Sequence, residues 1–451
     1  MSQPRPYTKH ATALLALGLP LVGSHIAQIL ISVTDTVMLG WYSVDALAAV
    51  SISTSLAFVL FIVGSGFAFA VMPMVAAAMA DGSEAQVRRV TRMGLWISAL
   101  YGLAVMPVLI WSKVVMLALG QDAQIAQLSQ DYLRIFSLGM VPGLLVMVLK
   151  NYLAALERTQ IVLWVTVGAA ILNGIANYML IFGKFGAPEL GIRGAAIASV
   201  MMQFATLVAL VIYTSRVTPE HAMFQRFWRP DWEAFARVFR LGWPIGLTNL
   251  AESGLFAASA VMMGWLGPLP LAAHGIALQL ASLTFVAHLG LSQAATVRAG
   301  NAMGRRDGRG LRDGALVASA LSAAFAGLTI IMYLTIPEFL MGLFLDPGDP
   351  DRPAILAIGV GLLVVAALFQ LVDGAQVVAL GLLRGLQDTR APMFYAAISY
   401  WVIGMPTSYV FGFTLGMDGI GIWLGLVVGL ALAAVFLMVR FWTVGVRGVP
   451  V

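Results

Sequence analysis

Three acidic residues lie deep inside apolar stretches of the chain: Asp35, Glu252 and Asp373. An acid at the centre of a membrane-spanning helix costs roughly 2.5 to 3.5 kcal/mol on insertion scales, so it normally faces a cavity or a partner. No arginine or lysine is expected at a comparable depth to pair with these acids. An unpaired carboxylate in a low dielectric either takes a proton or binds a cation. The three acids therefore predict cation chemistry.

Polar side chains accompany each acid at helical spacing. They are Ser24 and Gln28 with Asp35, Thr248 and Ser259 with Glu252, and Gln370 and Gln376 with Asp373. Carboxylate, amide and hydroxyl oxygens suit a hard cation. A hard monovalent ion such as Na⁺ would fit these oxygens, and a proton is the alternative. The same acids would attract a lipophilic amine.

Three histidines, His25, His274 and His288, fall in the same apolar stretches. A proton relay is one interpretation, because histidine titrates near neutral pH. Neutral histidines that hydrogen-bond between helices are the interpretation we favour. His274 is also a candidate cavity residue.

The elements that must position these residues are membrane-spanning helices, since 60% of the residues are hydrophobic and only 10% are charged. About 20 apolar residues cross a hydrocarbon core of roughly 30 Å. The sequence predicts an all-α polytopic membrane protein with twelve spans: 14–40, 46–80, 88–119, 128–155, 160–184, 189–216, 237–266, 271–303, 312–345, 355–386, 391–416 and 419–443. Cysteine is absent, which excludes disulfides and thiolate metal sites.

Most basic residues fall on one side of these spans, among them Arg5, Arg89, Arg384 and Arg440. By the positive-inside rule, both termini are expected in the cytoplasm. The arginines are scattered over several loops, so they argue against a nucleic-acid surface. No small-residue cleavage site follows the N-terminal segment, and we expect the first span to be retained.

The chain also contains an internal repeat. The segment that begins at Leu17 matches the segment that begins at Leu241, pairing Pro20 with Pro244 and Trp41 with Trp265. The repeat predicts two six-helix lobes, 1–217 and 237–451, with a binding region between them. The linker 218–236 is basic and aromatic, and the longer segment 214–240 resembles a helix that lies in the cytoplasmic interface.

At these residues the sequence resembles the multidrug and toxic compound extrusion family, in particular its NorM-like bacterial branch. The resemblance covers nearly the whole chain. It rests on four segments: VTDTVMLGWYSVDALAAV around Asp35, NLAESGLFAASAVMMGWLGPLPLAAHGIAL around Glu252, LSQAATVRAG from Leu291 and DGAQVVALGLLRGLQDTRAP from Asp373.

The resemblance implies two six-helix lobes around a cleft and cation-coupled export. Glu252 and Asp373 match the acidic pair of the C-terminal lobe, so the resemblance implies that they form the coupling-ion site and hold Na⁺ as the metal ion, with H⁺ as the alternative. Asp35 matches the aspartate of the first helix, which the resemblance implies takes a proton or Na⁺. Candidate polar partners and cavity residues are Asn173, Asn177, Gln279, Gln28, His274 and Gln376. Some relatives have aspartate where Asn177 stands, and many have proline where His288 stands.

The resulting hypothesis is an antiporter of the bacterial inner membrane, not an enzyme. It would export amphipathic cationic compounds in exchange for Na⁺ or H⁺, as a monomer in the lipid bilayer, without a cofactor and without binding nucleic acid. A flippase for lipid-linked oligosaccharides is the nearest alternative, but its polyanionic substrate should demand buried arginines. A membrane enzyme is a weaker alternative, because no His-Glu-x-x-His or Gly-x-Ser-x-Gly motif occurs.

Overall fold

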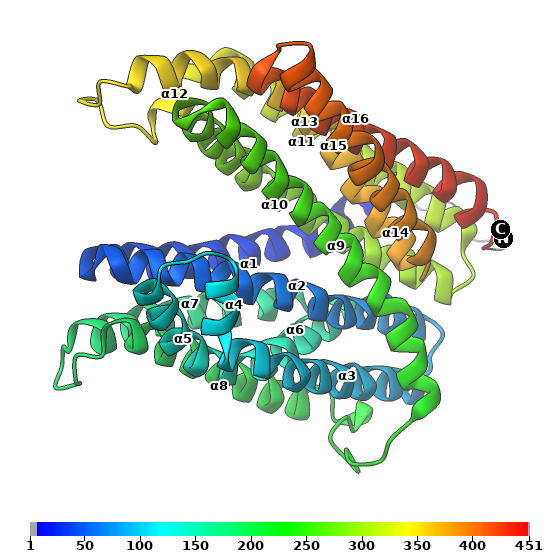
Figure 1. Cartoon of the computed structure of the whole chain (residues 1–451). Helices are drawn as coiled ribbons and strands as arrows, with labels where there is room; N and C mark the ends of the chain where they lie inside the picture. The colour runs from blue at the N-terminus through cyan, green and yellow to red at the C-terminus, as the bar shows by residue number, and fades with distance from the viewer. Residues whose placement is uncertain (1–6, 450–451) are drawn as a thin grey trace. The chain divides into compact units, whose positions relative to one another are not determined.

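The computed structural model describes residues 7–449, which form helices joined by short turns (Figure 1). The chain divides into two compact units. The N-unit is Gly23–Gly246, and the C-unit combines the residues up to Val22 with those from Leu247 onward. Helices α1 (Tyr7–Tyr42) and α9 (Trp232–Leu266) each pass from one unit into the other. The division at 217 and 237 expected from the repeat stays a prediction, since the units reflect contacts and not sequence likeness.

The N-unit is built mainly from α2, α3, α6, α7 and α8. α2 packs on both α3 and α6, and α7 packs on α8. The bounds are α2 Val44–Ala80, α3 Glu84–Ile110, α4 Ser112–Ala118, α5 Ala123–Phe136, η1 Ser137–Gly139, α6 Met140–Ala155, α7 Thr159–Phe182, α8 Gly191–Val217 and η2 Pro219–His221.

The C-unit is organised around α13, which packs against α10, α11 and α16 (Figure 1). Three of its short segments, η3, η4 and η5, are π-helical. The bounds are α10 Pro268–Gly304, α11 Gly308–Thr335, α12 Pro337–Gly342, α13 Arg352–Gly385, α14 Arg390–Ala397, η3 Ile398–Gly404, α15 Met405–Tyr409, η4 Val410–Thr414, α16 Asp418–Arg440 and η5 Phe441–Gly445.

Eleven helical stretches of the described chain are long and apolar enough to cross a membrane. The remaining predicted span, 391–416, corresponds to the run from α14 to η4, where π-helical turns divide the helix into short pieces. Two other predicted spans are shorter than expected. The span 88–119 ends at Ile110 and continues as the separate α4, and the span 312–345 ends at Thr335 before α12. The all-helical membrane fold predicted from the sequence is confirmed.

Small and hydroxylated residues bring α10 and α13 close together. A Cβ added at Gly381 would lie 2.3 Å from the Ser292 Oγ and 2.5 Å from the Ser292 carbonyl oxygen. Ser292 Oγ donates a 2.6 Å hydrogen bond to the Val377 carbonyl, and Thr296 Oγ1 donates a 2.9 Å bond to the Gly381 carbonyl. Such close approach with hydroxyl-to-carbonyl bonds is a common way to hold helices together within lipid. It holds the stretch of α13 that carries Asp373.

The interfacial helix predicted within 214–240 is not formed. Between η2 and α9 the chain makes turns, and Ala222 and Arg226 have positive φ values of 43° and 51°, which helical residues do not adopt. The segment is instead held against α3. Arg92 Nη2 donates to the Gln225 carbonyl at 2.6 Å, and Trp96 Nε1 donates to the Phe227 carbonyl at 3.0 Å.

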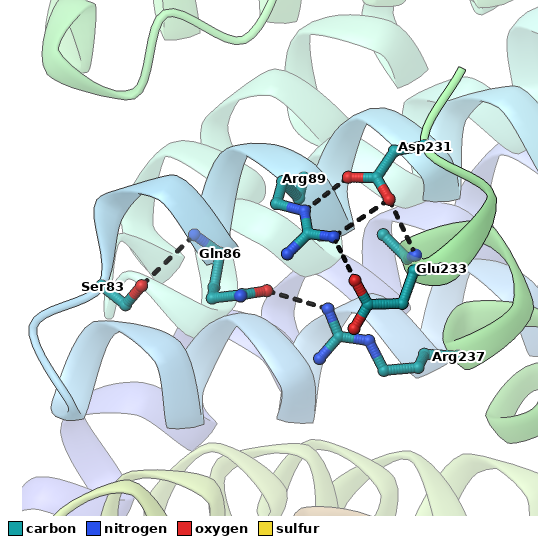
Figure 2. Close-up of polar contacts among 7 residues, drawn as sticks. Ser83, Gln86, Arg89, Asp231, Glu233 and Arg237 are labelled. Atoms are coloured by element: carbon teal, nitrogen blue, oxygen red, sulfur yellow. Dashed lines mark hydrogen bonds and ion pairs between the residues drawn. The ribbon is translucent and has the colours of Figure 1, made fainter.

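An ionic cluster fixes the end of this linker, where α9 begins (Figure 2). Arg89 on α3 pairs with Asp231 and also with Glu233, and Arg237 donates a 2.9 Å hydrogen bond to Gln86 Oε1. Asp231 also caps α9, because its Oδ1 accepts from the Ala234 amide at 3.0 Å. Hydrogen bonds from Arg89 hold the pKa of the Asp231 carboxyl below its ordinary value.

The sign of the pH effect follows from this lowered pKa. A group whose pKa is depressed on folding stabilises the folded state above its unfolded pKa, here about 3.9, and loses this contribution as the pH falls through the folded value. The clamp between Arg89 and Asp231 is therefore complete at neutral pH and weakens only below about pH 4.

Arg5 and the two chain ends lie outside the described residues. The cytoplasmic location of both termini therefore stays a prediction.

We predict that Asp231→Asn loosens the linker. Asparagine keeps the helix cap, since the two residues cap equally well, but it removes the charge paired with Arg89. Trypsin should cleave the variant faster after Arg226 in detergent at neutral pH, as mapped by mass spectrometry. Glu233→Gln is the matched control, because Glu233 is 71% exposed and exposed pairs contribute only about 0 to 1 kcal/mol. Equal cleavage of the two variants would contradict the prediction.

Candidate cation sites and family

The first candidate site lies in the C-unit and contains Glu252 of α9 and Asp373 of α13. The two carboxylates are close enough to repel each other. Asp373 is only 2% exposed. Glu252 Oε1 and Asp373 Oδ1 are buried and find no hydrogen-bond partner among residues 7–449. A buried acceptor without a donor is costly, and a bound proton or cation would relieve that cost.

Amide and phenol groups surround this acidic pair. Gln376 Nε2 donates a 2.6 Å hydrogen bond to Tyr400 Oη, and both side chains are fully buried. Gln376 also lies beside Glu252, and the Tyr400 hydroxyl interacts electrostatically with both acids. Gln370, one turn before Asp373, is buried with an amide that has no partner in the described chain. Oxygen ligands for a hard cation are thus concentrated at this point.

Arg384 corrects one expectation from the sequence, namely that no basic residue reaches the depth of the acids. Its Nη2 donates a 2.8 Å hydrogen bond to Asn249 Oδ1, one helical turn before Glu252. It also interacts electrostatically with Glu252. The long arginine side chain extends the charge well beyond its own Cα, which explains why a position near the end of α13 can influence a site on α9.

The second candidate site lies in the N-unit, between α1 and α7. Asn177 Nδ2 donates to Asp35 Oδ1 at 2.5 Å and to Asn173 Oδ1 at 3.1 Å. Both asparagines are fully buried, and Asn173 Nδ2 and Asn177 Oδ1 have no partner in the part of the chain that the structure describes. Tyr132 of α5, 2% exposed, interacts electrostatically with Asp35. The structure thus brings together Asp35, Asn173 and Asn177.

The polar face of α1 explains the pairing with α7. Ser24 and Thr166 share a 2.9 Å hydrogen bond nearer the start of α1, and Asp35 meets Asn177 three turns later. The two contacts lie on one side of α1, as the helical period predicts. Gln28, a candidate cavity residue on the same face, is exposed within the N-unit and joins neither contact.

The histidines in α10 are held between helices. His274 Nδ1 accepts a 3.0 Å hydrogen bond from Trp423 Nε1, and His288 Nδ1 shares a 2.9 Å bond with Ser322 Oγ. Each is 1% exposed. His288 also packs against α13, because a Cβ at Gly374, next to Asp373, would lie 2.6 Å from its Cε1. Gln279 is exposed in the C-unit, and the hydrogen bond between Trp423 and His274 does not involve the acidic pair.

Sequence reasoning missed Tyr400, Arg384 and Tyr132 as members of these sites. Tyr400 and Tyr132 fall within predicted spans, where an aromatic residue most often indicates helix packing, so the sequence held no signal for them. Arg384 had one usable signal, since it lies within the same segment as Asp373 and eleven residues after it. The distance along the sequence from Asp373 does not show that the Arg384 side chain reaches α9.

Comparison with known proteins places these sites in a family. The MatE family model matches residues 20–179 and 244–410, two segments that start at the prolines paired by the internal repeat. The chain belongs to the MatE family. Its members are the multidrug and toxic compound extrusion transporters, so this chain is a multi-pass membrane transporter and not an enzyme.

Two bacterial relatives are similar to this MatE chain over nearly its full length. It is 44% identical to the probable multidrug resistance protein NorM of Agrobacterium fabrum over 434 residues, which cover 96% of this chain and 93% of the relative. It is 45% identical to the protein of the same name from Rhizobium meliloti over 435 residues, with the same coverage of 96% and 93%.

Solved structures share the fold of this MatE chain. The eukaryotic MATE transporter AtDTX14 superposes with a TM-score of 0.86 at 19% identity, covering 98% of this chain and 97% of that one. An outward-facing multidrug resistance MATE family transporter superposes with a TM-score of 0.87 at 17% identity, covering 98% and 96%. At these identities the likeness shows the fold alone.

We predict that Tyr400→Phe destabilises this MatE chain. Removing the hydroxyl deprives the buried Gln376 amide of its acceptor, and a buried group left unsatisfied costs about 1 to 3 kcal/mol. The thermal unfolding midpoint in detergent should fall. Tyr409→Phe is the matched control, because the Tyr409 ring is 51% exposed. A midpoint unchanged in Tyr400→Phe, or lowered equally in both, would show that the bond does not stabilise the site.

Proposed function

We propose that this chain is a secondary active efflux antiporter that exports amphipathic cationic compounds in exchange for Na⁺ or H⁺ by alternating access. One observation carries the proposal: Glu252 and Asp373 lie together with buried carboxylate oxygens that no donor of the described chain satisfies. Such oxygens have their lowest free energy when a proton or cation binds them. An exported cation and a coupling ion can compete for the same acids.

The charge of the cluster favours a monovalent ion. With both acids ionised and Arg384 beside Glu252, the C-unit site carries one net negative charge. A single Na⁺ or H⁺ neutralises it, whereas a divalent ion would leave a buried positive charge, which is costly. The oxygens of Gln376, Gln370 and Tyr400 could complete the shell of Na⁺. We favour Na⁺ at this site.

A second cation step is proposed at Asp35. Its site offers amides of Asn173 and Asn177 but no second carboxylate, so it is suited to hold one proton or one Na⁺. The relatives named as probable multidrug resistance proteins support drug-like compounds as the exported class. We further propose a monomer in the bacterial inner membrane, with both termini in the cytoplasm and the predicted lobes 1–217 and 237–451 moving against each other.

A flippase for lipid-linked oligosaccharides is the rival proposal. One solved structure with this fold, from Pyrococcus furiosus, is described as having a binding pocket of reverse polarity that suggests a different function for that transporter. A polyanionic substrate would need unpaired buried cations. Here the buried groups without partners at the candidate sites are carboxylates and amides, and Arg384 is bonded to Asn249. This polarity favours cationic substrates.

We predict that Glu252→Gln and Asp373→Asn each nearly abolish export of a fluorescent cation such as ethidium. Each change keeps the side-chain volume and removes charge. Proteoliposomes under an imposed Na⁺ gradient, and separately under an imposed H⁺ gradient, provide the measurement. Asp35→Asn, which removes the charge of the second proposed cation site, should lower the efflux rate or shift the pH dependence of efflux. Glu338→Gln, at an exposed acid of α12, is the control and should keep the rate. Inserted Glu252→Gln protein with normal efflux would sink the assignment.

We also predict that the coupling ion and the exported cation bind antagonistically. Linkage makes the effect reciprocal, and a coupling free energy of about 1 to 3 kcal/mol raises the apparent drug dissociation constant roughly 5- to 150-fold. Titration of a fluorescent cation into purified protein across Na⁺ concentrations and pH values measures it. Direct competition predicts that Glu252→Gln lowers drug affinity and flattens the ion dependence together. Affinity that responds to neither ion would contradict antiport.

A further inference from the structure

An apolar pocket of about 440 Å³ lies in the C-unit between α9 and the π-helical run that contains η3 and α15. Its volume falls within the range of roughly 300 to 1,000 Å³ typical of small-molecule sites. Three aromatic side chains line it: Trp265 of α9, Trp401 of η3 and Tyr409 of α15. Their exposed fractions are 65%, 44% and 51%, so the rings are accessible to a ligand within this unit.

The lining comes from one face of each helix. On α9 the lining residues follow helical spacing from Ala258 to Trp265, with Met262 between them, and the opposite wall includes Met405 and Pro406. Thioethers adapt to ligands of irregular shape. At one end, Trp265 and Tyr409 both contact the Phe413 ring, at centroid distances of 5.9 and 5.1 Å.

Trp401 connects this pocket to the acidic pair. Its Nε1 donates a 3.1 Å hydrogen bond to the carbonyl of Ala251, the residue before Glu252. Its ring lies against Gly254, where a Cβ would be 2.9 Å from the Trp401 Cζ2. The preceding residue, Tyr400, is fully buried and belongs to the acidic site. Consecutive residues of one π-helical turn therefore serve the pocket and the cation site.

We propose that this pocket is a binding site for flat or multi-ring lipophilic cations, distinct from the carboxylates. Aromatic faces attract organic cations, and the attraction increases where water is excluded. The acids add a long-range pull, since Ala258 lies about 9 Å from Glu252 along the axis of α9. The lining holds no charged residue that would repel a cation. The role of this pocket rests on the proposed efflux function: it would bind the exported compound during transport.

The chain contains no cysteine, so a single introduced thiol can report on the pocket. Ala258→Cys places the thiol in the pocket lining, and Ala257→Cys places it on the exposed neighbouring position of α9 as the matched control. Both variants are reconstituted in lipid nanodiscs and alkylated with N-ethylmaleimide. Tetraphenylphosphonium at about ten times its dissociation constant should slow alkylation at position 258 roughly tenfold, the factor 1 + [L]/Kd. The rate at position 257 should not change.

Two further comparisons establish the chemistry of the occupant. Trp265→Leu should raise the tetraphenylphosphonium dissociation constant about 2- to 30-fold, the range expected for one cation–π contact, whereas Trp265→Phe should largely keep the affinity. Tetraphenylsilane, a neutral molecule of the same shape, should protect position 258 poorly. Equal protection by both compounds would mean that the pocket takes an acyl chain or any apolar molecule, and would overturn the proposal.

The outcome is separable from that of the proposed function. In the Ala258→Cys background, Glu252→Gln should abolish efflux but keep protection by tetraphenylphosphonium at about ten times the dissociation constant of that variant, because Glu252 does not line the pocket. Protection with normal efflux would refute the coupling site and keep the pocket. The opposite pair of results would refute the pocket and keep the coupling site: Glu252→Gln abolishes efflux, but tetraphenylphosphonium does not protect position 258 in protein that keeps Glu252.

Discussion

The structure depends on one constraint. A carboxylate buried within an apolar fold cannot at the same time be charged, dehydrated and without a partner. At Asp35 the constraint is met in part by the Asn177 amide. At Glu252 and Asp373 it is met less well, since one oxygen of each acid lacks a donor in residues 7–449. The unsatisfied electrostatics are the source of cation affinity. Both sites lie where helices of the same unit meet.

Holding such groups requires a rigid frame around them. In the C-unit this frame is α13, which packs on α10 through glycines and through hydroxyl bonds to backbone carbonyls. Small residues allow the backbones to approach closely without leaving their polar groups unpaired. The run from α14 to η4 is less regular than this frame, because it contains π-helical turns. Such turns often occur at functional sites, and here one of them orients Tyr400 and Trp401.

The two repeats share a fold and differ in charge. Each starts with a proline-containing helix, α1 or α9, that contributes one acid to a candidate site and has residues in both compact units. The N-unit acid is surrounded by amides, whereas the C-unit acid meets a second acid and an arginine. Duplication preserved the helical frame because lipid requires every backbone group to bond within the helix, while side chains facing the interior could diverge.

The sequence by itself determined the membrane fold, the repeat, the family and the three acids, because hydropathy and buried charge are local properties that lipid makes costly to violate. It also led to the pairing of Asp35 with Asn173 and Asn177, through family resemblance. Only the tertiary structure decided that Arg384 reaches Asn249 and that Tyr400 joins the acidic pair. It also replaced the interfacial helix by turns clamped to α3. These features depend on side-chain reach and on contacts between segments distant in sequence, which no local pattern encodes.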